Sequence, residues 1–328
     1  MYYKERRKLM KKFLALLSLV AVFILTACGQ TTKTDATTTQ SAVEEKSEVT
    51  LTNGKEDVTV KTNPKKIVVF DLGIADTIRE LGFVDHIVGM PLKTLPTYLK
   101  DLPSSIQSTG SMVEPDIEAI AALEPDLIIA SGRTIKYLDQ LKEIAPTVIF
   151  SVDQKDYWTS VSKNIGLVAS LFGKEAEAKA AEEIKSLEAS IKKIADANEK
   201  SNDKTLTLML NEGKMSAFGA DSRFAFLYQS LKFKATDAKI EDSKHGQEMS
   251  FEGIKEINPD TIVLLNRTLA IGGDNSNADT VLDNELFKET NAVKNNRVIQ
   301  LTSDLWYLSG GGLQSTKLMI EDIQKALQ

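Results

Sequence analysis

Two arginines occupy matching places in an internal repeat of the sequence. The segments 118–133 and 252–267 align without a gap: each begins with Glu, carries a Pro-Asp pair before an apolar run, and ends with Arg. Each segment reads as a helix, a Pro-Asp turn and a strand, with the arginine just beyond the end of the strand. A guanidinium group stays charged and offers forked donors to anionic oxygen atoms. Arg133 and Arg267 are therefore candidate residues for binding an anionic ligand.

The repeat lies within two runs of alternating short strands and helices. The first run extends from an apolar strand at 67–70 to a strand at 148–150, and the second extends from a strand at 206–210 to a closing helix at 313–327. Such alternation is typical of α/β lobes with mainly parallel sheets. Ligands of open α/β sheets bind beyond the carboxyl ends of the strands. We therefore expect an α/β protein with two Rossmann-like lobes, in which both arginines face a ligand cleft between the lobes.

A long helical stretch separates the two runs. From Asp156 to Lys200, apolar residues recur at helical spacing without a proline, and Gly166 and Gly173 are the residues that could interrupt it. Any bend or break is expected at Gly173. A helix of ~40 residues would be ~60 Å long, which suits either a coiled-coil arm or a strut between lobes. Because the apolar pattern does not keep a heptad and a lobe lies on each side, we expect a single connecting helix.

The N-terminus reads as a targeting segment. Basic residues up to Lys12 precede an apolar run that is short for a membrane span and that closes with Leu-Thr-Ala-Cys, ending at Cys28. This ending resembles the lipobox of bacterial lipoproteins, in which the cysteine carries lipid and becomes the first residue of the mature chain. The resemblance implies an extracytoplasmic protein held to the cell membrane only through a lipid anchor on Cys28. The alternative is an ordinary signal peptide with a chance cysteine.

The stretch after Cys28 is rich in Thr, Ser, Gln, Lys and Glu. It has too few apolar residues to fold alone and reads as a flexible tether. The expected boundaries are a lipoprotein signal peptide at 1–27, a polar tether at 28–52, an N-terminal lobe at 53–155, the connecting helix at 156–200 and a C-terminal lobe at 201–328.

Composition limits the possible partners and metal sites. Six of the 40 Lys and Arg residues lie at or before Lys12, so the rest of the chain is more acidic than the net charge of −6 suggests. An acidic body argues against nucleic acid as a partner. The one cysteine, Cys28, excludes an internal disulfide. Two histidines, His86 and His245, are too few for a His-rich zinc or manganese site, and we expect His86 on the surface or packed.

The signal ending, the two lobes, the connecting helix and the Leu-x-Pro-Asp-Leu-Ile-Ile unit at 123–129 together resemble the helical-backbone class of substrate-binding proteins of ABC importers. The resemblance extends from about residue 55 to the end of the chain. It implies capture of a ferric siderophore, haem, cobalamin or a metal for delivery to a permease dimer. We expect a monomer without an intrinsic cofactor.

Two segments restrict the range of possible ligands. Residues 243–252 and 304–312 resemble loops of the catecholate-siderophore receptors in this class, in which a His and the Tyr of a Trp-Tyr-x-Ser-Gly-Gly-Gly loop bind the ferric ion. The resemblance implies that His245 and Tyr307 bind the iron of a ferric catecholate siderophore, the transported ligand. A phenolate suits hard Fe(III), and an imidazole is an acceptable nitrogen donor. Two catechols fill four of six coordination positions, which leaves two for the protein.

Other residues receive roles from the same resemblance. Arg223, which opens a helix after a strand-like run, matches the third arginine of the family. Trp306 either stacks on the ligand or packs in the protein. Gly310–Gly312 are expected to allow a tight loop before the last helix. Glu118 and Glu252, at matching places in the repeat, would dock on arginines of the permease, whose two-fold symmetry fits such a pair.

Two other functions are open. Within the same class the chain could bind haem or cobalamin, which the absorbance of the loaded protein would distinguish from ferric catecholate. It could also be an extracytoplasmic enzyme acting on ferric siderophore, with His and Tyr as acid and base. The sequence contains no Gly-x-Ser-x-Gly motif, phosphate-binding Walker loop or zinc-protease motif. We therefore expect a binding protein and not an enzyme.

Overall fold

The computed structural model describes residues 47–52, 56–241, 243, 245–274 and 281–327. The expected signal peptide and the expected anchor, Cys28, lie outside the described residues. Residues 45–328 form one compact unit. No helix in the described part of the chain is long and apolar enough to cross a membrane.

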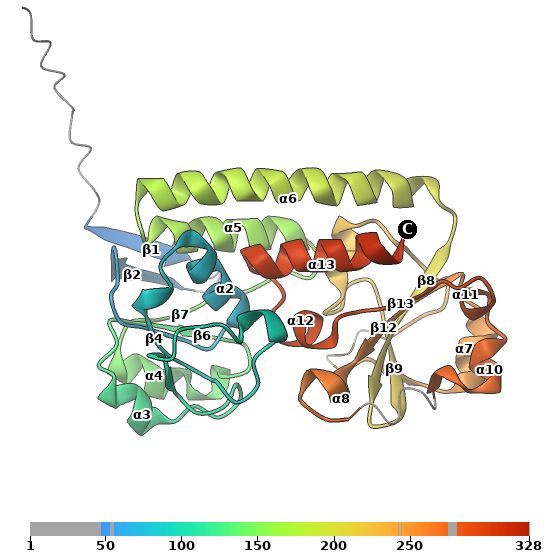
Figure 1. The fold of residues 1–328 in the computed structure, drawn as a ribbon, viewed down its shortest axis with the longest axis horizontal. Helices are drawn as coiled ribbons and strands as arrows, with labels where there is room; N and C mark the ends of the chain where they lie inside the picture. The colour runs from blue at the N-terminus through green and yellow to red at the C-terminus, as the bar shows by residue number, and fades with distance from the viewer. Residues whose placement is uncertain (1–46, 53–55, 242, 244, 275–280, 328) are drawn as a thin grey trace, which may run out of the picture. The chain divides into compact units, whose positions relative to one another are not determined.

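The N-terminal lobe is built on a parallel sheet of five strands (Figure 1). In the order in which they pair, its strands are β5 (Gln107–Ser108), β4 (Ile87–Met90), β3 (Ile67–Val69), β6 (Leu127–Ala130) and β7 (Thr147–Ile149). The central strands β3 and β6 are wholly buried, as expected for apolar runs in a covered parallel sheet. The helical elements of this lobe are α2 (Leu72–Leu81), η1 (Val84–His86), η2 (Thr97–Leu99), α3 (Ile117–Ala122), η3 (Ile135–Tyr137) and α4 (Leu138–Ile144).

The C-terminal lobe has a mixed sheet around the long strand β8 (Lys204–Asn211). Strand β12 (Thr261–Asn266) pairs with β8 in parallel, whereas β9 (Lys214–Phe218) returns antiparallel to it. The other strands are β10 (Lys234–Ala235), β11 (Gln247–Met249) and β13 (Val298–Gln300). The helices are η4 (Phe226–Ser230), α7 (Phe251–Ile257), α8 (Arg267–Ala270), α10 (Glu285–Lys288), α11 (Asn291–Lys294), α12 (Ser303–Leu308) and α13 (Leu313–Ala326).

The helix expected at 156–200 is broken into two helices, of which the second connects the lobes. Helix α5 (Tyr157–Ser170) ends before Gly173, and α6 (Lys174–Lys200) begins after it. Gly173 has φ of 89°, a left-handed conformation that favours glycine and that reverses the chain here. The two helices lie side by side, and α6 alone runs from one lobe to the other (Figure 1). With 27 residues, α6 is about 40 Å long.

The folded part begins earlier than the boundary expected at residue 53. Strand β1 (Glu48–Thr52) pairs antiparallel with β2 (Asp57–Lys61) in a separate two-stranded sheet. Its inward residue Leu51 is fully buried and belongs to the main apolar core. The last residues of the expected tether are therefore part of the fold, because alternating Val49 and Leu51 provide an apolar face.

Among the described residues, buried apolar side chains form three clusters. One lies on the N-terminal sheet with Val68 and Ile128, and one lies on the C-terminal sheet with Leu208 and Ile262. The largest cluster includes residues of both sheets together with residues of α2, α5, α6 and α13. The two lobes therefore share an apolar core on the side where α5, α6 and α13 lie, which predicts little freedom for one lobe to move against the other.

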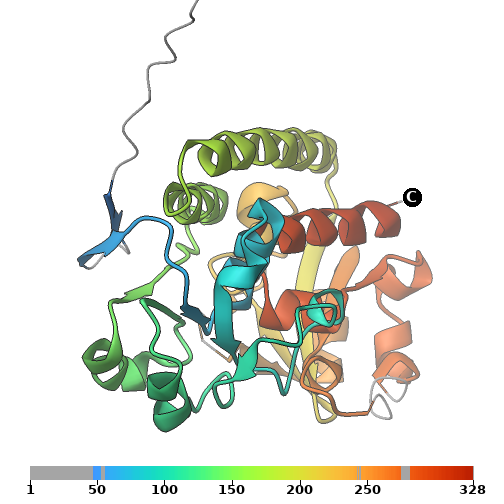
Figure 2. The same cartoon turned by 60° about the vertical axis from the view of Figure 1, so that its left-hand side comes forward.

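The closing helix α13, expected in the C-terminal lobe, is held by the N-terminal lobe. The buried Asp76 carboxylate of α2 accepts hydrogen bonds from the backbone amides of Gln314 (2.8 Å) and Ser315 (2.6 Å), in the first turn of α13. The backbones of α2 and of the triple-glycine loop approach so closely that a Cβ on Gly312 would overlap the carbonyl oxygen of Gly73. Figure 2 shows α13 beside α2. This contact between the lobes thus requires glycine at position 312.

We predict that Asp76 makes the stability of the protein depend on pH. Burial raises the pKa of Asp76 from its ordinary value of 3.8 to about 6, although the amides of Ser315 and Gln314 oppose the shift. Between these values the folded state binds the proton more tightly than the unfolded state, so the free energy of unfolding falls as the pH rises. Relative to Asp76→Asn, wild type should lose up to about 3 kcal/mol between pH ~4 and pH ~6.

Urea unfolding of both proteins at several pH values measures this difference. Asp139→Asn, which changes an exposed carboxylate, is the matched control and should follow wild type at every pH. Parallel curves for wild type and Asp76→Asn would show that Asp76 does not titrate in this range.

Candidate ligand-binding site

Three arginines surround the ring of Tyr307. The guanidinium carbons of Arg133, Arg223 and Arg267 lie 5.9, 4.2 and 5.5 Å from its centroid. We call these three residues the arginine cage. Tyr307 itself lies in helix α12 and not in the loop that the sequence suggested, because the tight loop begins after Leu308. The cage joins the two halves of the chain, since Arg133 belongs to the N-terminal lobe.

Each arginine of the cage donates a hydrogen bond to Tyr307. Nη2 of Arg133 and Nη2 of Arg223 donate to its backbone carbonyl, at 2.8 and 3.0 Å. Nε of Arg267 donates to its hydroxyl oxygen at 2.8 Å. Asn211, the last residue of β8, accepts from Nη1 of Arg267 at 2.6 Å and so fixes that guanidinium. The hydroxyl oxygen of Tyr307 is therefore held as an acceptor.

The environment of the cage shifts the pKa values of Tyr307 and Arg223. Partial burial alone would raise the pKa of Tyr307, but the hydrogen bond and charge of Arg267, with the charge of Arg223, outweigh it and lower the pKa. Burial lowers the pKa of Arg223; the nearby Tyr307 opposes this shift and the charge of Arg133 adds to it. A guanidinium nevertheless remains charged in proteins. The site therefore favours an anion, including the phenolate of Tyr307 itself.

The repeat of the sequence places two of these arginines. Arg133 follows strand β6 in a tight turn, in which its backbone amide donates to Ser131 Oγ at 3.2 Å. Arg267 opens helix α8 directly after strand β12. Both strands are parallel neighbours of the central strand of their sheet, so both arginines lie at the carboxyl edge where α/β proteins bind ligands. Arg223 comes from the segment that follows β9.

His245 lines a cavity together with Tyr307 and two arginines of the cage. This cavity has a volume of about 470 Å³, and the two arginines are Arg133 and Arg223. His245 is exposed, and the next residue, Gly246, turns the chain with φ of 76° against the ring of Phe218. The remaining lining residues are Gln154, Asp221, Ser222 and Ser243. An imidazole and a phenol from different elements thus border one open, polar space.

Trp306 packs in the protein. Its side chain is 7% exposed, and its Nε1 donates to the carboxylate of Asp322 on α13 at 2.9 Å. Its ring also lies against Phe226, with 6.1 Å between centroids. The same Asp322 accepts from the amide and hydroxyl of Thr302, at 2.7 and 3.0 Å, and so braces α12 at its start. These contacts favour a packing role for Trp306 over stacking on a ligand.

Three polar residues near the cage were not found from the sequence. Asp71 caps α2 and lines a smaller space beside Arg133 and Tyr307; burial raises its pKa despite hydrogen bonds from Ile74 and Gly73 and the charge of Arg133. Asn211 and Asp322 orient Arg267 and α12. Asp71 and Asn211 follow or end a strand at the carboxyl edge of the sheet, which is the signal that could have found them.

The expected docking and packing residues lie away from the cage. Glu118 and Glu252 are exposed in the first turns of α3 and α7, which are capped by Asp116 and Ser250. His86 packs against Phe83 and Phe172, and its Nδ1 lies 2.7 Å from a backbone carbonyl oxygen.

The described lining of the cavity contains few groups that could bind a metal. The described part of the chain contains no group of three or more His, Cys, Asp and Glu residues that could hold a metal ion. His245 and Tyr307 are two donors, which is too few for Fe(III) alone. Two donors suit a metal that arrives with most of its other ligands.

Comparison with known proteins identifies the family of this chain. Residues 67–305 match the family described as periplasmic binding protein. The petrobactin-binding protein YclQ of Bacillus subtilis is 37% identical over 97% of this chain and 100% of its own length. Its crystal structure superposes with a TM-score of 0.82 over 86% of this chain and 99% of that chain.

Two further crystal structures share the fold. The iron uptake ABC transporter substrate-binding protein PiuA of Streptococcus pneumoniae is 63% identical, with a TM-score of 0.84 over 86% of this chain and 99% of that chain. The periplasmic catecholate-siderophore binding protein VctP of Vibrio cholerae is 30% identical, with a TM-score of 0.79 over 85% and 99%. The expected α/β fold of two lobes is confirmed.

We predict that Arg267→Gln raises the pKa of Tyr307, because the substitution removes the cation and the donor that stabilise its phenolate. The near-ultraviolet absorbance of phenolate, titrated with pH, gives this pKa when the curve of a Tyr307→Phe variant is subtracted in each background. Arg297→Gln, which removes an arginine paired with Asp203, is the matched control and should leave the titration unchanged. If Arg267→Gln leaves the pKa of Tyr307 unchanged, Arg267 does not stabilise the phenolate.

Proposed function

Since this chain belongs to the periplasmic binding protein family, we propose that it captures a ferric catecholate siderophore between its lobes and delivers it to an ABC permease for iron uptake. The observation that carries the proposal is the convergence of Arg133, Arg223 and Arg267 on Tyr307 beside a cavity that His245 also lines. The names of YclQ and VctP, which describe siderophore-binding proteins, support it.

The charge of the cage suits this ligand. A ferric ion with two doubly deprotonated catechols carries a charge of −1, and with three it carries −3. The three guanidinium groups supply positive charge and forked donors for catecholate oxygen atoms. The lining of the cavity is polar and charged, whereas the broad apolar face of haem would need apolar walls. The cage therefore favours ferric catecholate over haem.

Two protein donors complete the ferric coordination in this proposal. A bis-catecholate leaves two of six positions open, and His245 and Tyr307 would fill them from one cavity. Fe(III) prefers anionic oxygen, and the lowered pKa of Tyr307 makes its phenolate easier to form. Arg267 already donates to the hydroxyl oxygen, so that bond can remain when the oxygen loses its proton.

Delivery would use the outer surfaces of both lobes and a lipid anchor. Glu118 and Glu252 are exposed at matching places on the two lobes. Each of the two symmetric halves of a permease dimer could therefore contact one of these glutamates in a single bound monomer. The lipobox-like ending at Cys28 would hold the protein outside the membrane near that permease. The description of PiuA as a substrate-binding protein of an iron uptake ABC transporter supports this partner.

We predict that Tyr307→Phe weakens bis-catecholate binding by roughly 10- to 100-fold, the loss of one strong contact in a partly dry site. The change keeps the ring and its packing but removes the oxygen donor. His245→Ala should cause a similar loss. A tris-catecholate fills all six positions, so its affinity should fall much less in either variant. Titration of the intrinsic fluorescence with both ferric complexes measures the comparison.

Tyr137→Phe, a change of the same kind outside the cage, is the control and should bind both complexes as wild type does. Equal losses for the tetradentate and hexadentate ligands in Tyr307→Phe would contradict direct coordination. Tyr307 would then be a wall of the cleft, held by the arginines for its shape.

We predict that delivery can be separated from capture in cells. A Glu118→Ala/Glu252→Ala variant should bind the ferric complex as wild type does but support less iron uptake, and Cys28→Ala should release the protein or leave its precursor uncut. Uptake of radiolabelled iron complex and fractionation of the cells measure both effects. Glu175→Ala/Glu182→Ala, on the exposed face of α6, is the matched control. Normal uptake in the first variant, or normal membrane retention of Cys28→Ala, would contradict the corresponding role.

A further inference from the structure

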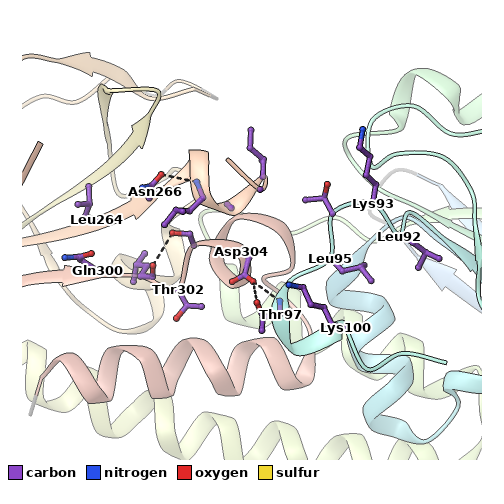
Figure 3. Close-up of a pocket in the computed structure, with 17 residues that line it drawn as sticks. Leu92, Lys93, Leu95, Thr97, Lys100, Leu264, Asn266, Gln300, Thr302 and Asp304 are labelled. Atoms are coloured by element: carbon purple, nitrogen blue, oxygen red, sulfur yellow. Dashed lines mark hydrogen bonds between the residues drawn. The ribbon is translucent and has the colours of Figure 1, made fainter. Parts of the chain in front are cut away.

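A second and larger cavity lies between the lobes. Its volume is about 690 Å³, within the ~300–1,000 Å³ typical of small-molecule sites. One wall is the segment that follows β4 in the N-terminal lobe, and the other is formed by α8, the start of α12 and the ends of β12 and β13 (Figure 3). His245, Tyr307 and the arginine cage do not line it. It is therefore a compartment of its own beside the proposed iron site.

The cavity has apolar walls that are only partly covered. Leu269 and Ile271, at the end of α8, are 40% and 42% exposed. Leu92 and Leu95 line the cavity from the N-terminal lobe (Figure 3). Large apolar side chains on both sides of a concave space gain free energy when a ligand with an apolar body displaces water from them.

The cavity also carries two lysines without partners. Lys93 and Lys100, both exposed, lie on the N-terminal wall (Figure 3). Among the residues that the structure describes, neither side-chain ammonium group forms a hydrogen bond or an ion pair; the backbone amide of Lys100 donates to the carbonyl of Thr97. The carboxylate of Asp304 also lines the cavity; it accepts from the amide and the hydroxyl of Thr97, both at 2.7 Å, and within the described residues it forms no ion pair with either lysine. The two ammonium groups are thus available to an anion that the apolar walls also hold.

We propose that this compartment binds an organic anion with an apolar body, held by Lys93 and Lys100. The anion has two possible sources. It can be an acidic arm of the ferric chelate, because Asp304 and Tyr307 lie one helical turn apart on α12 and Asn266 of the compartment precedes Arg267. It can also be a separate amphipathic acid. The first source rests on the proposed function, whereas the second does not.

Calorimetry with octanoate and octanol tests the compartment itself. Octanoate should bind wild type at least about tenfold more tightly than octanol, which has the same body without the charge. Lys93→Met/Lys100→Met should abolish that preference. Lys317→Met/Lys325→Met, which removes two exposed lysines of α13, is the matched control and should keep it.

A pair of ferric bis-catecholates, one with a pendant hexanoate arm and one without, distinguishes the sources. If the arm is the source, the armed complex binds wild type about tenfold more tightly than the armless one, and the gain disappears in Lys93→Met/Lys100→Met. If the anion is a separate acid, the armed and armless complexes bind wild type with equal affinity. Octanoate then binds the protein loaded with ferric complex as tightly as it binds the free protein.

The compartment is overturned if octanoate and the armed complex bind Lys93→Met/Lys100→Met as tightly as wild type, or if wild type shows neither octanoate binding nor a gain from the arm. The armless complex tests the proposed function separately. Failure of that complex to bind any of the three proteins, together with the expected behaviour of octanoate, would overturn the proposed function and leave the compartment in place.

Discussion

The convergence of three like charges on one phenol is the constraint on which the site depends. Guanidinium groups that share one small volume repel each other, and burial removes the water that would screen them. These charges lower the pKa of the Tyr307 phenol. The backbone carbonyl oxygen of Tyr307 accepts hydrogen bonds from Arg133 and Arg223, and its hydroxyl oxygen accepts one from Arg267. The cluster is nevertheless richer in positive charge than Tyr307 can balance. Asp71 beside Arg133 offsets part of this charge, and an anionic ligand would offset more of it.

The fold holds this cluster together by bracing the segment that carries Tyr307. Two hydrogen bonds fix helix α12 at its start. Asp304 accepts one from the backbone amide of Thr97 in the N-terminal lobe, and Asp322 of α13 accepts one from the backbone amide of Thr302. The helix that follows the triple-glycine loop begins on the buried Asp76 of α2. These contacts and the shared apolar core beneath α6 make the cleft a largely preformed one. A preformed site avoids the cost of ordering its groups when the ligand binds.

The sequence predicted the parts of the site that follow from local pattern. The repeat placed Arg133 and Arg267 because a strand followed by an arginine at the carboxyl edge is a local feature of an α/β sheet. The resemblance supplied His245 and Tyr307. The sequence indicates Gly173 as the position of a bend or break, but whether the helix breaks there, and whether Tyr307 is helical, depends on the backbone conformation of single residues. The attachment of α13 to the N-terminal lobe could not be predicted from the sequence. Asp76 and Gln314 are 238 residues apart, and no local sequence pattern links them.

Resonance Raman spectroscopy of the ferric bis-catecholate complex tests the central claim that the phenolate of Tyr307 binds the iron. Protein labelled with ring-deuterated tyrosine should show bands that shift relative to unlabelled protein, in addition to the bands of the catecholate, and these bands should be missing in Tyr307→Phe. Excitation within the iron–phenolate charge-transfer band selects them. A spectrum that contains catecholate bands alone, unchanged by the label, would contradict the account.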